Sequence, residues 1–141
     1  MSFMVPASLV FENSRIIISY NTSNKLNSTN TAIVISGNEN GFLSLSNSLI
    51  YASNMLEEQI RLEELPFVKS SSKVHIIIDD DIKNVHGYII KINENEFEWL
   101  LSEVNMDVVS SAIHSLGYVN KELHFDSGMD ESETSVYCVV D

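Results

Sequence analysis

Short apolar runs, each bounded by polar or turn-forming residues, constrain this chain more than any other feature. The runs are rich in isoleucine and valine, whose branched side chains fit the pleated surface of a β-sheet. They are also too short for helices. Strands are therefore predicted at residues 15–20, 31–36, 73–78, 87–92, 122–126 and 135–140. Apolar residues on either side of Pro6 predict a further short edge strand near the N-terminus.

Two stretches show helical spacing instead. In the first, Ser44 or Ser46 caps the start, Pro66 stops the helix, and the apolar positions are Leu45, Leu49, Ala52, Leu56 and Ile60. Glutamates 57 and 58 lie at its far end, where they oppose the helix dipole. In the second, Asn95 caps a helix that begins at Glu96 and stops at Gly117, with an apolar stripe at Val108, Val109, Ala112, Ile113 and Leu116.

Together these elements predict a single α+β domain spanning residues 1–141, with a mostly antiparallel sheet and two principal helices. A chain of 141 residues with 44% hydrophobic content is large enough for one core. Segments 73–78 and 87–92 are expected to pair as one hairpin, and segments 122–126 and 135–140 as another.

A short internal sequence similarity, here called the echo, suggests that the domain contains a duplication. Residues 35–45 and 90–100 each contain a strand end, then Asn-Glu-Asn, then phenylalanine with leucine three residues later. Each copy is followed by a helix and by a strand that carries a histidine, His75 or His124. The echo predicts two β-α-β-β halves that share the middle strand pair.

The charge balance limits the class of partner. The chain has 20 acidic and 8 basic residues, a formal net charge of −12. Such a surface repels nucleic acid and anionic membrane, and it attracts a basic protein surface. The same acidity is also explained by solubility alone.

No catalytic or metal-binding pattern stands out. Glycine-rich phosphate loops, the G-x-S-x-G elbow and the spacings of zinc and calcium sites are all absent. The available metal ligands are histidines and aspartates around 75–86 and 124–126, which are too sparse to predict a site. We therefore expect no cofactor, no catalytic residue and no metal.

The acidic residues gather in turns and at helix ends, where water keeps them ionised. The segments that follow predicted strands are expected to meet at one end of the sheet and to form a negative patch. The predicted partner-binding residues are Asp79, Asp80, Asp81, Glu94, Glu96, Asp126, Asp130, Glu131 and Glu133.

Cysteine use and the N-terminus indicate the compartment. Cys138 is the only cysteine, lies in an apolar strand and is expected in the core. The N-terminal residues show no signal-peptide pattern, and no apolar run approaches the length of a transmembrane helix. A cytoplasmic protein is the expectation. The sequence carries no signal for an oligomeric state.

Two regions of the chain resemble immunity proteins of bacterial polymorphic toxin systems, such as contact-dependent growth inhibition. One is Ile-Val-Ile-Ser-Gly-Asn leading into a leucine-rich helix at residues 31–52. The other is Leu-His-Phe-Asp, an acidic turn and Ser-Val-Tyr-Cys-Val-Val within residues 117–141. The resemblance implies a small, acidic, non-catalytic cytoplasmic protein that binds and blocks a cognate toxin domain, often a nuclease with a basic cleft.

The sequence is also compatible with two other functions. The first is a non-catalytic adaptor or chaperone for another basic or secreted protein. The second is a small metal-dependent hydrolase that uses His75, Asp79, His124 and Asp126.

Overall fold

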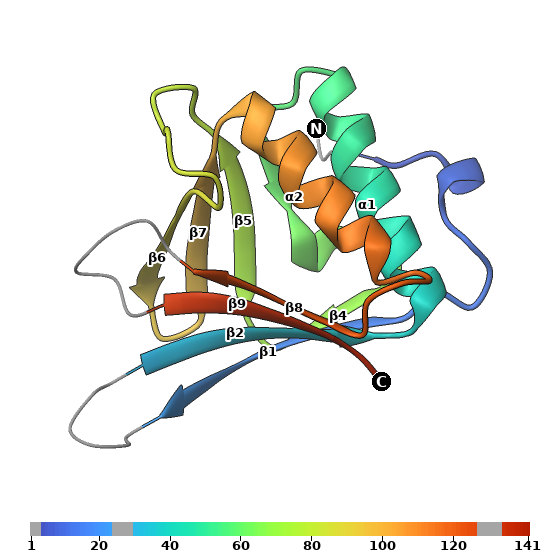
Figure 1. The fold of residues 1–141 in the computed structure, drawn as a ribbon, viewed down its shortest axis with the longest axis horizontal. Coiled ribbons are helices and arrows are strands. Elements are labelled where there is room, and N and C mark those ends of the chain that lie inside the picture. Colours follow the sequence, from blue (N-terminus) through green and yellow to red (C-terminus); the bar gives the residue numbers. More distant parts are fainter. Residues whose placement is uncertain (1–3, 24–29, 127–133) are drawn as a thin grey trace.

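The structure is a computed structural model that describes residues 4–23, 30–126 and 134–141. It contains two mixed β-sheets and two long helices (Figure 1). The five-stranded sheet has the order β4 (Val68–Ser70), β1 (Ile16–Ser23), β2 (Asn30–Gly37), β9 (Thr134–Val140), β8 (Glu122–Asp126). The four-stranded sheet has the order β3 (Gln59–Arg61), β5 (Lys73–Ile78), β7 (Glu96–Leu101), β6 (Tyr88–Asn93).

The two helices lie side by side over the five-stranded sheet, and the four-stranded sheet runs crosswise to it (Figure 1). They are α1 (Glu39–Asn54) and α2 (Glu103–Ser115), and two short 3-10 helices, η1 (Ala7–Leu9) and η3 (Leu62–Glu64), complete the fold. Small side chains allow α1 and α2 to approach closely. The Ser46 hydroxyl, for example, donates to the Ser110 carbonyl at 2.8 Å.

One hydrophobic core joins both sheets and both helices. It takes Ile16, Ile18, Ile33 and Ile35 from the five-stranded sheet, Val74, Ile76, Phe97 and Trp99 from the four-stranded sheet, and Phe42, Leu45, Leu49, Val109 and Ile113 from the helices. The predicted single α+β domain with two principal helices is therefore confirmed. Four of the seven strand pairings are antiparallel, and the strands divide between two sheets.

The structure confirms the six predicted strands to within three residues at each end, but it corrects the first helix. Asn38 caps α1, because its side chain accepts a hydrogen bond from the Gly41 amide at 2.7 Å. The helix ends at Asn54, well before Pro66. Leu56 then adopts a left-handed backbone with φ of 58°, and Ile60 belongs to β3.

The prediction of a helix beginning at Glu96 is wrong. Residues Glu96–Leu101 form β7, in which Phe97, Trp99 and Leu101 are buried on one face and the intervening residues are partly exposed. Asn95 lies in the β6–β7 turn, and Ser102 caps α2. As a result β6 pairs with β7 and not with β5, whose neighbours are β7 and β3. The edge strand expected around Pro6 is also wrong: η1 occupies residues 7–9.

The topology does contain two similar halves, although not at the residues that the echo matched. Each half is a hairpin, a helix and an antiparallel strand pair: β1-β2-α1-β3-β5 and β6-β7-α2-β8-β9. The closing pairs are exchanged, so that β9 joins β2 in parallel and β5 joins β7 in parallel. The halves therefore interlock and do not share a middle pair. One Asn-Glu-Asn begins α1, and the other forms a hairpin turn.

Candidate partner-binding site

Acidic residues from three segments of the chain meet at one end of the four-stranded sheet: the segment after α1, the segment after β5 and the start of α2. Strands β5 and β7 are parallel, so the C-terminal ends of both strands lie at this end of the sheet. The Asp79 amide donates to the Leu101 carbonyl at 2.8 Å, which fixes the chain that leaves β5 beside the end of β7. The Ile78 amide donates to the Glu58 carbonyl at 2.9 Å, which brings the segment after α1 to the same place.

The packing of the two helices brings further carboxylates to this end of the sheet, from the segment after α1 and from the start of α2. The helices run antiparallel, so the end of α1 lies beside the start of α2, and Ser53 and Glu103 line one pocket. The Glu103 amide donates to the Asp80 side chain at 3.0 Å. We call this region the acidic corner and define it as Glu57, Glu58, Asp79, Asp80, Asp81 and Glu103.

Carboxylates at the acidic corner are mostly unneutralised. Glu57, Glu58 and Glu103 form no ion pair with any residue that the structure describes. One base lies close to the corner: the Lys83 ammonium donates to the Asp80 backbone carbonyl at 3.2 Å. Glu103 suits the positive end of the α2 dipole, whereas Glu57 and Glu58 follow the negative end of α1. The corner therefore presents a strong negative field.

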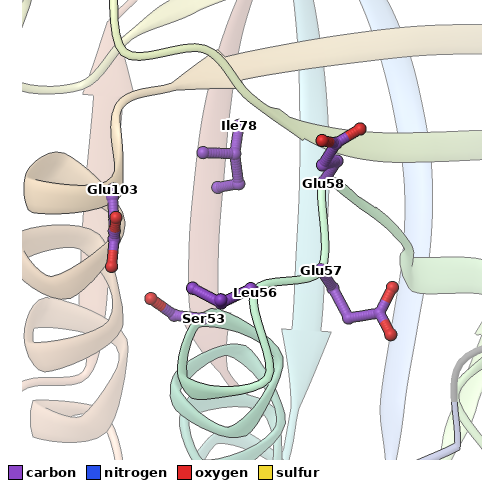
Figure 2. A pocket seen from close by; sticks show the side chains of 6 residues that line it. All are labelled: Ser53, Leu56, Glu57, Glu58, Ile78 and Glu103. Carbon is purple, nitrogen blue, oxygen red and sulfur yellow. The ribbon is translucent and has the colours of Figure 1, made fainter.

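Two hollows flank Glu103. The smaller, the Leu56 pocket, has a volume of about 90 Å³ and is lined by Ser53, Leu56, Glu57, Glu58, Ile78 and Glu103 (Figure 2). The larger has a volume of about 430 Å³ and is lined by Asp80, Ile82, Lys83, Ser102, Glu103, Val104 and Asn105.

Exposed apolar side chains accompany the charges. Leu56 is 77% exposed in the wall of the smaller pocket, and Val104 is 72% exposed beside the larger one. Val108 lies one turn beyond Val104 on the outer face of α2 and is 44% exposed. Apolar side chains next to unpaired charges are typical of protein-binding surfaces, in which an apolar centre is surrounded by a polar rim.

The structure does not gather all the predicted binding residues. Asp79, Asp80 and Asp81 lie in the acidic corner. Glu94 and Glu96 lie at the opposite end of the four-stranded sheet, because Glu96 pairs with Lys73 at the start of β5. Six-residue strands separate the two groups by roughly 16 Å. The single patch expected from the sequence is therefore wrong: these residues form two groups, and Asp126 lies apart from both at the end of β8. Asp130, Glu131 and Glu133 lie outside the described residues.

The helical spacing predicted Glu57 and Glu58 on a helix that continued past them, and it predicted Glu103 inside a longer second helix. Their contribution to the corner was missed for that reason. The available signal was the conflict between these glutamates and the dipole of α1.

Asp126 belongs to a different group on the outer face of the five-stranded sheet. His124 lies 3.2 Å from the Ser135 hydroxyl and 3.6 Å from the Asp126 carboxylate. The order Ser-His-Asp is that of a hydrolytic triad, but 3.6 Å exceeds a hydrogen bond. The side chains of His124 and Asp126 are 55% and 78% exposed, so water screens their interaction. The group lacks the desolvated geometry that activates a serine.

His75 does not join His124, as the hydrolase alternative required. It is buried in β5, where its Nε2 lies 2.9 Å from the Glu63 carboxylate and its Nδ1 lies 3.2 Å from the Gln59 side-chain amide. Glu63 also accepts the Val74 amide at 3.0 Å. These contacts tie η3 to β5. Among the described residues, no group of three or more histidine, cysteine, aspartate or glutamate side chains is placed to hold a metal.

Cys138 is fully buried in β9, as expected. Burial raises the pKa of its thiol to about 12, so the reactive thiolate is strongly disfavoured. A role as a nucleophile is therefore not supported.

Comparison with known proteins identifies no relative of this chain. No protein-family model matches the chain, and neither the curated proteins nor the solved structures include a match. Within the described residues, neither helix has the length and apolar character needed to cross a bilayer.

Proposed function

We propose that this protein is a cytoplasmic immunity protein that binds a cognate toxin domain and neutralises it without catalysis. The observation that carries the proposal is the acidic corner, where carboxylates from three segments of the chain lie near exposed apolar side chains. This combination matches a basic protein surface in charge and offers it apolar contact.

A nuclease-type toxin suits this surface best. A nuclease holds the phosphates of its substrate in a basic cleft, because cationic side chains replace the counterions of the nucleic acid. A folded domain with net charge −12 competes for such a cleft without being a substrate. Long-range attraction between the two charged surfaces accelerates their encounter by ~10 to 1000-fold at low salt.

Co-expression with the product of the neighbouring upstream gene tests the proposal. The two proteins are expected to co-purify as a stoichiometric complex, and the neighbouring protein is expected to be toxic when it is expressed alone. A variant destabilised in the core, Phe42→Ala, serves as the control for loss through unfolding. Absence of a complex with well-folded protein contradicts the proposal. A complex in which the partner keeps full activity favours an adaptor or chaperone instead.

A further inference from the structure

We propose that the outer face of the five-stranded sheet packs against the same face of a second copy of this chain. The outer face is the side of the sheet opposite the two helices, and its centre contains Ile17, Val34, Tyr137 and Val139. The assembly is a symmetric homodimer in which the two sheets stack face to face. The inference goes beyond the proposed function and does not depend on a toxin partner.

Only one side of the five-stranded sheet is covered by other elements. The core takes alternate residues from its central strands, namely Ile16, Ile18, Ile33, Ile35, Val136 and Cys138. Both helices lie on that side, and no described element lies against the other side (Figure 1). Ile17, Val34 and Val139 lie outside the core, and Ile17 is 38% exposed. Within the described part of the chain, the outer face therefore has no second layer.

The centre of the outer face is uncharged. Strands β1, β2 and β9 present Ile17, Val34, Tyr137 and Val139 there, and their other outward positions with described side chains are serine or alanine. Charged residues make up 20% of the chain, and its net charge is −12. Two copies repel each other least when they meet through an uncharged surface.

Opposite charges end one row of side chains across this face. Lys69 lies on β4 at one edge of the sheet, and Glu122 lies on β8 at the other edge. The strand register connects them through a single row: Lys69, Ile17, Ser36, Val139, Glu122. Lys69 forms no ion pair with any described residue, so its charge is available to a partner.

A second pair of charges follows the same direction. Arg15 precedes β1 and Asp141 follows β9, and the two side chains are hydrogen bonded at 2.7 Å across the end of β2. The Tyr137 hydroxyl donates to the Glu122 carboxylate at 2.6 Å, which keeps that carboxylate on the outer face. Positive charge therefore lies on the β4–β1 side of the centre, and negative charge lies on the β9–β8 side.

This arrangement makes the face complementary to itself. A two-fold axis parallel to the strands lays β2 over its own copy, β1 over β9 of the second copy, and β4 over β8 of the second copy. Lys69 then faces Glu122 of the second copy, and the symmetry of the contact forms this pair twice. Arg15 likewise approaches Asp141 of the second copy. Self-complementarity of this kind favours a second copy over an unrelated partner.

The size of the face suits a weak dimer. Five strands about 4.8 Å apart, with about 3.3 Å per residue along them, give the face an extent of roughly 24 Å by 20 Å. The two faces together cover roughly 1000 Å², which is near the lower limit for a specific interface. Stacked sheets lie about 10 Å apart with their strands within about 30° of each other. We therefore expect a dissociation constant in the tens of micromolar.

Sedimentation velocity of the full chain tests the dimer without any other protein. The salt concentration is about 0.15 M, because screening then limits the general repulsion between two acidic copies. The wild-type protein is expected to pass from monomer to dimer between about 5 and 500 µM.

Matched valine variants locate the interface. Val34→Glu brings two carboxylates together at the two-fold axis and is expected to weaken association at least tenfold. Val108→Glu makes the same change on the exposed side of α2, away from the sheet, and is expected to change association less than twofold. Urea denaturation of each variant shows whether it is folded.

Charge reversal tests the predicted facing pair. Lys69→Glu and Glu122→Lys each make the facing charges alike and are expected to weaken association at least fivefold. General repulsion alone predicts the opposite for Glu122→Lys, because that variant is less acidic. The double variant restores opposite charges at the wild-type net charge and is expected to associate within twofold of wild type.

Folded wild-type protein that stays monomeric at about 500 µM would overturn the inference. A dimer that tolerates Val34→Glu, or single charge reversals that do not weaken it, would also overturn the inference. The acidic corner lies on the other sheet, so the two proposals fail separately. A toxin complex formed by a strictly monomeric protein removes only the dimer, and a dimer without a toxin complex removes only the proposed function.

Discussion

Leu56 occupies a backbone conformation that favours glycine, and this provides the most sensitive test of the geometry at the acidic corner. Its φ of 58° follows the end of α1, where its amide donates to Ser53 and the next amide, that of Glu57, donates to Ala52. This is the Schellman arrangement, and its left-handed position is usually glycine. A residue with a β-carbon there carries a penalty of about 1–2 kcal/mol.

The comparison of Leu56→Gly with Leu56→Ala isolates this penalty, because both variants lose the same exposed side chain. Glycine removes the clash but gains about 0.4–1 kcal/mol of extra freedom in the unfolded chain. The glycine variant is therefore expected to be more stable than the alanine variant by about 0.5–1 kcal/mol. Inside α1 the order of stability should reverse. The Ile50→Ala variant should be more stable than the Ile50→Gly variant by about 1 kcal/mol.

Urea denaturation measures both pairs. Trp99 is buried and its ring nitrogen donates to the His86 carbonyl at 2.7 Å, so its fluorescence reports unfolding. With a denaturant slope of about 2 kcal/mol/M, the midpoints of the two Leu56 variants should differ by roughly 0.25–0.5 M. An alanine variant as stable as the glycine variant would refute the left-handed conformation and, with it, the shape of the Leu56 pocket.

Three further predictions concern the buried Cys138, the left-handed Gly87 and the ion pair between Arg15 and Asp141. Cys138 should resist thiol reagents at pH 8 in native protein and react in urea, and rapid labelling of the native state would show that it is not buried. Gly87→Ala should destabilise by about 2 kcal/mol or more, because φ is 72° and the added β-carbon would lie 2.0 Å from the Leu100 carbonyl oxygen; an unchanged urea midpoint would contradict this. Hydrogen bonds from Arg15, together with its charge, lower the pKa of Asp141. The pair should therefore stabilise the fold above the unfolded pKa of about 3.9 and lose this effect as pH falls through the lower folded pKa, a pH dependence that Asp141→Asn should abolish.

Local composition was sufficient to predict most strands. The isoleucine- and valine-rich runs of β1, β2, β5 and β9 are too short for helices, so they indicate strands alone. The same branched side chains are also favoured by burial on the pleated surface of a sheet. Cys138 was placed correctly for the same reason. The sequence did not predict the correct structure for segments whose pattern suits both a strand and a helix. Glu96–Leu101 alternates polar and apolar residues, but its acidic start also suits a helix, and the pairing of β7 between β5 and β6 decides the outcome.

The acidic corner was predictable only in part. Asp79 to Asp81 followed an obvious strand, so their place at a sheet edge could be inferred. Glu57, Glu58 and Glu103 join them through the early end of α1, the parallel pairing of β5 with β7 and the antiparallel packing of the helices. Each of these is a contact between distant segments, and the spacing of residues along the chain does not encode it.

The association rate of the toxin complex tests the central claim most directly. Asp80→Asn, Asp81→Asn and Glu103→Gln together reduce the negative charge of the corner by three and keep the acceptor oxygen that Asp80 offers to the Glu103 amide. The control variant Glu94→Gln, Glu96→Gln, Glu98→Gln makes the same change of charge in the β6–β7 turn and the first half of β7, away from the corner. Stopped-flow measurement at low salt should show an association rate about tenfold slower for the corner variant and at most twofold slower for the control. Equal slowing by the two variants, or a greater effect of the control, would contradict the assignment of the acidic corner as the binding surface.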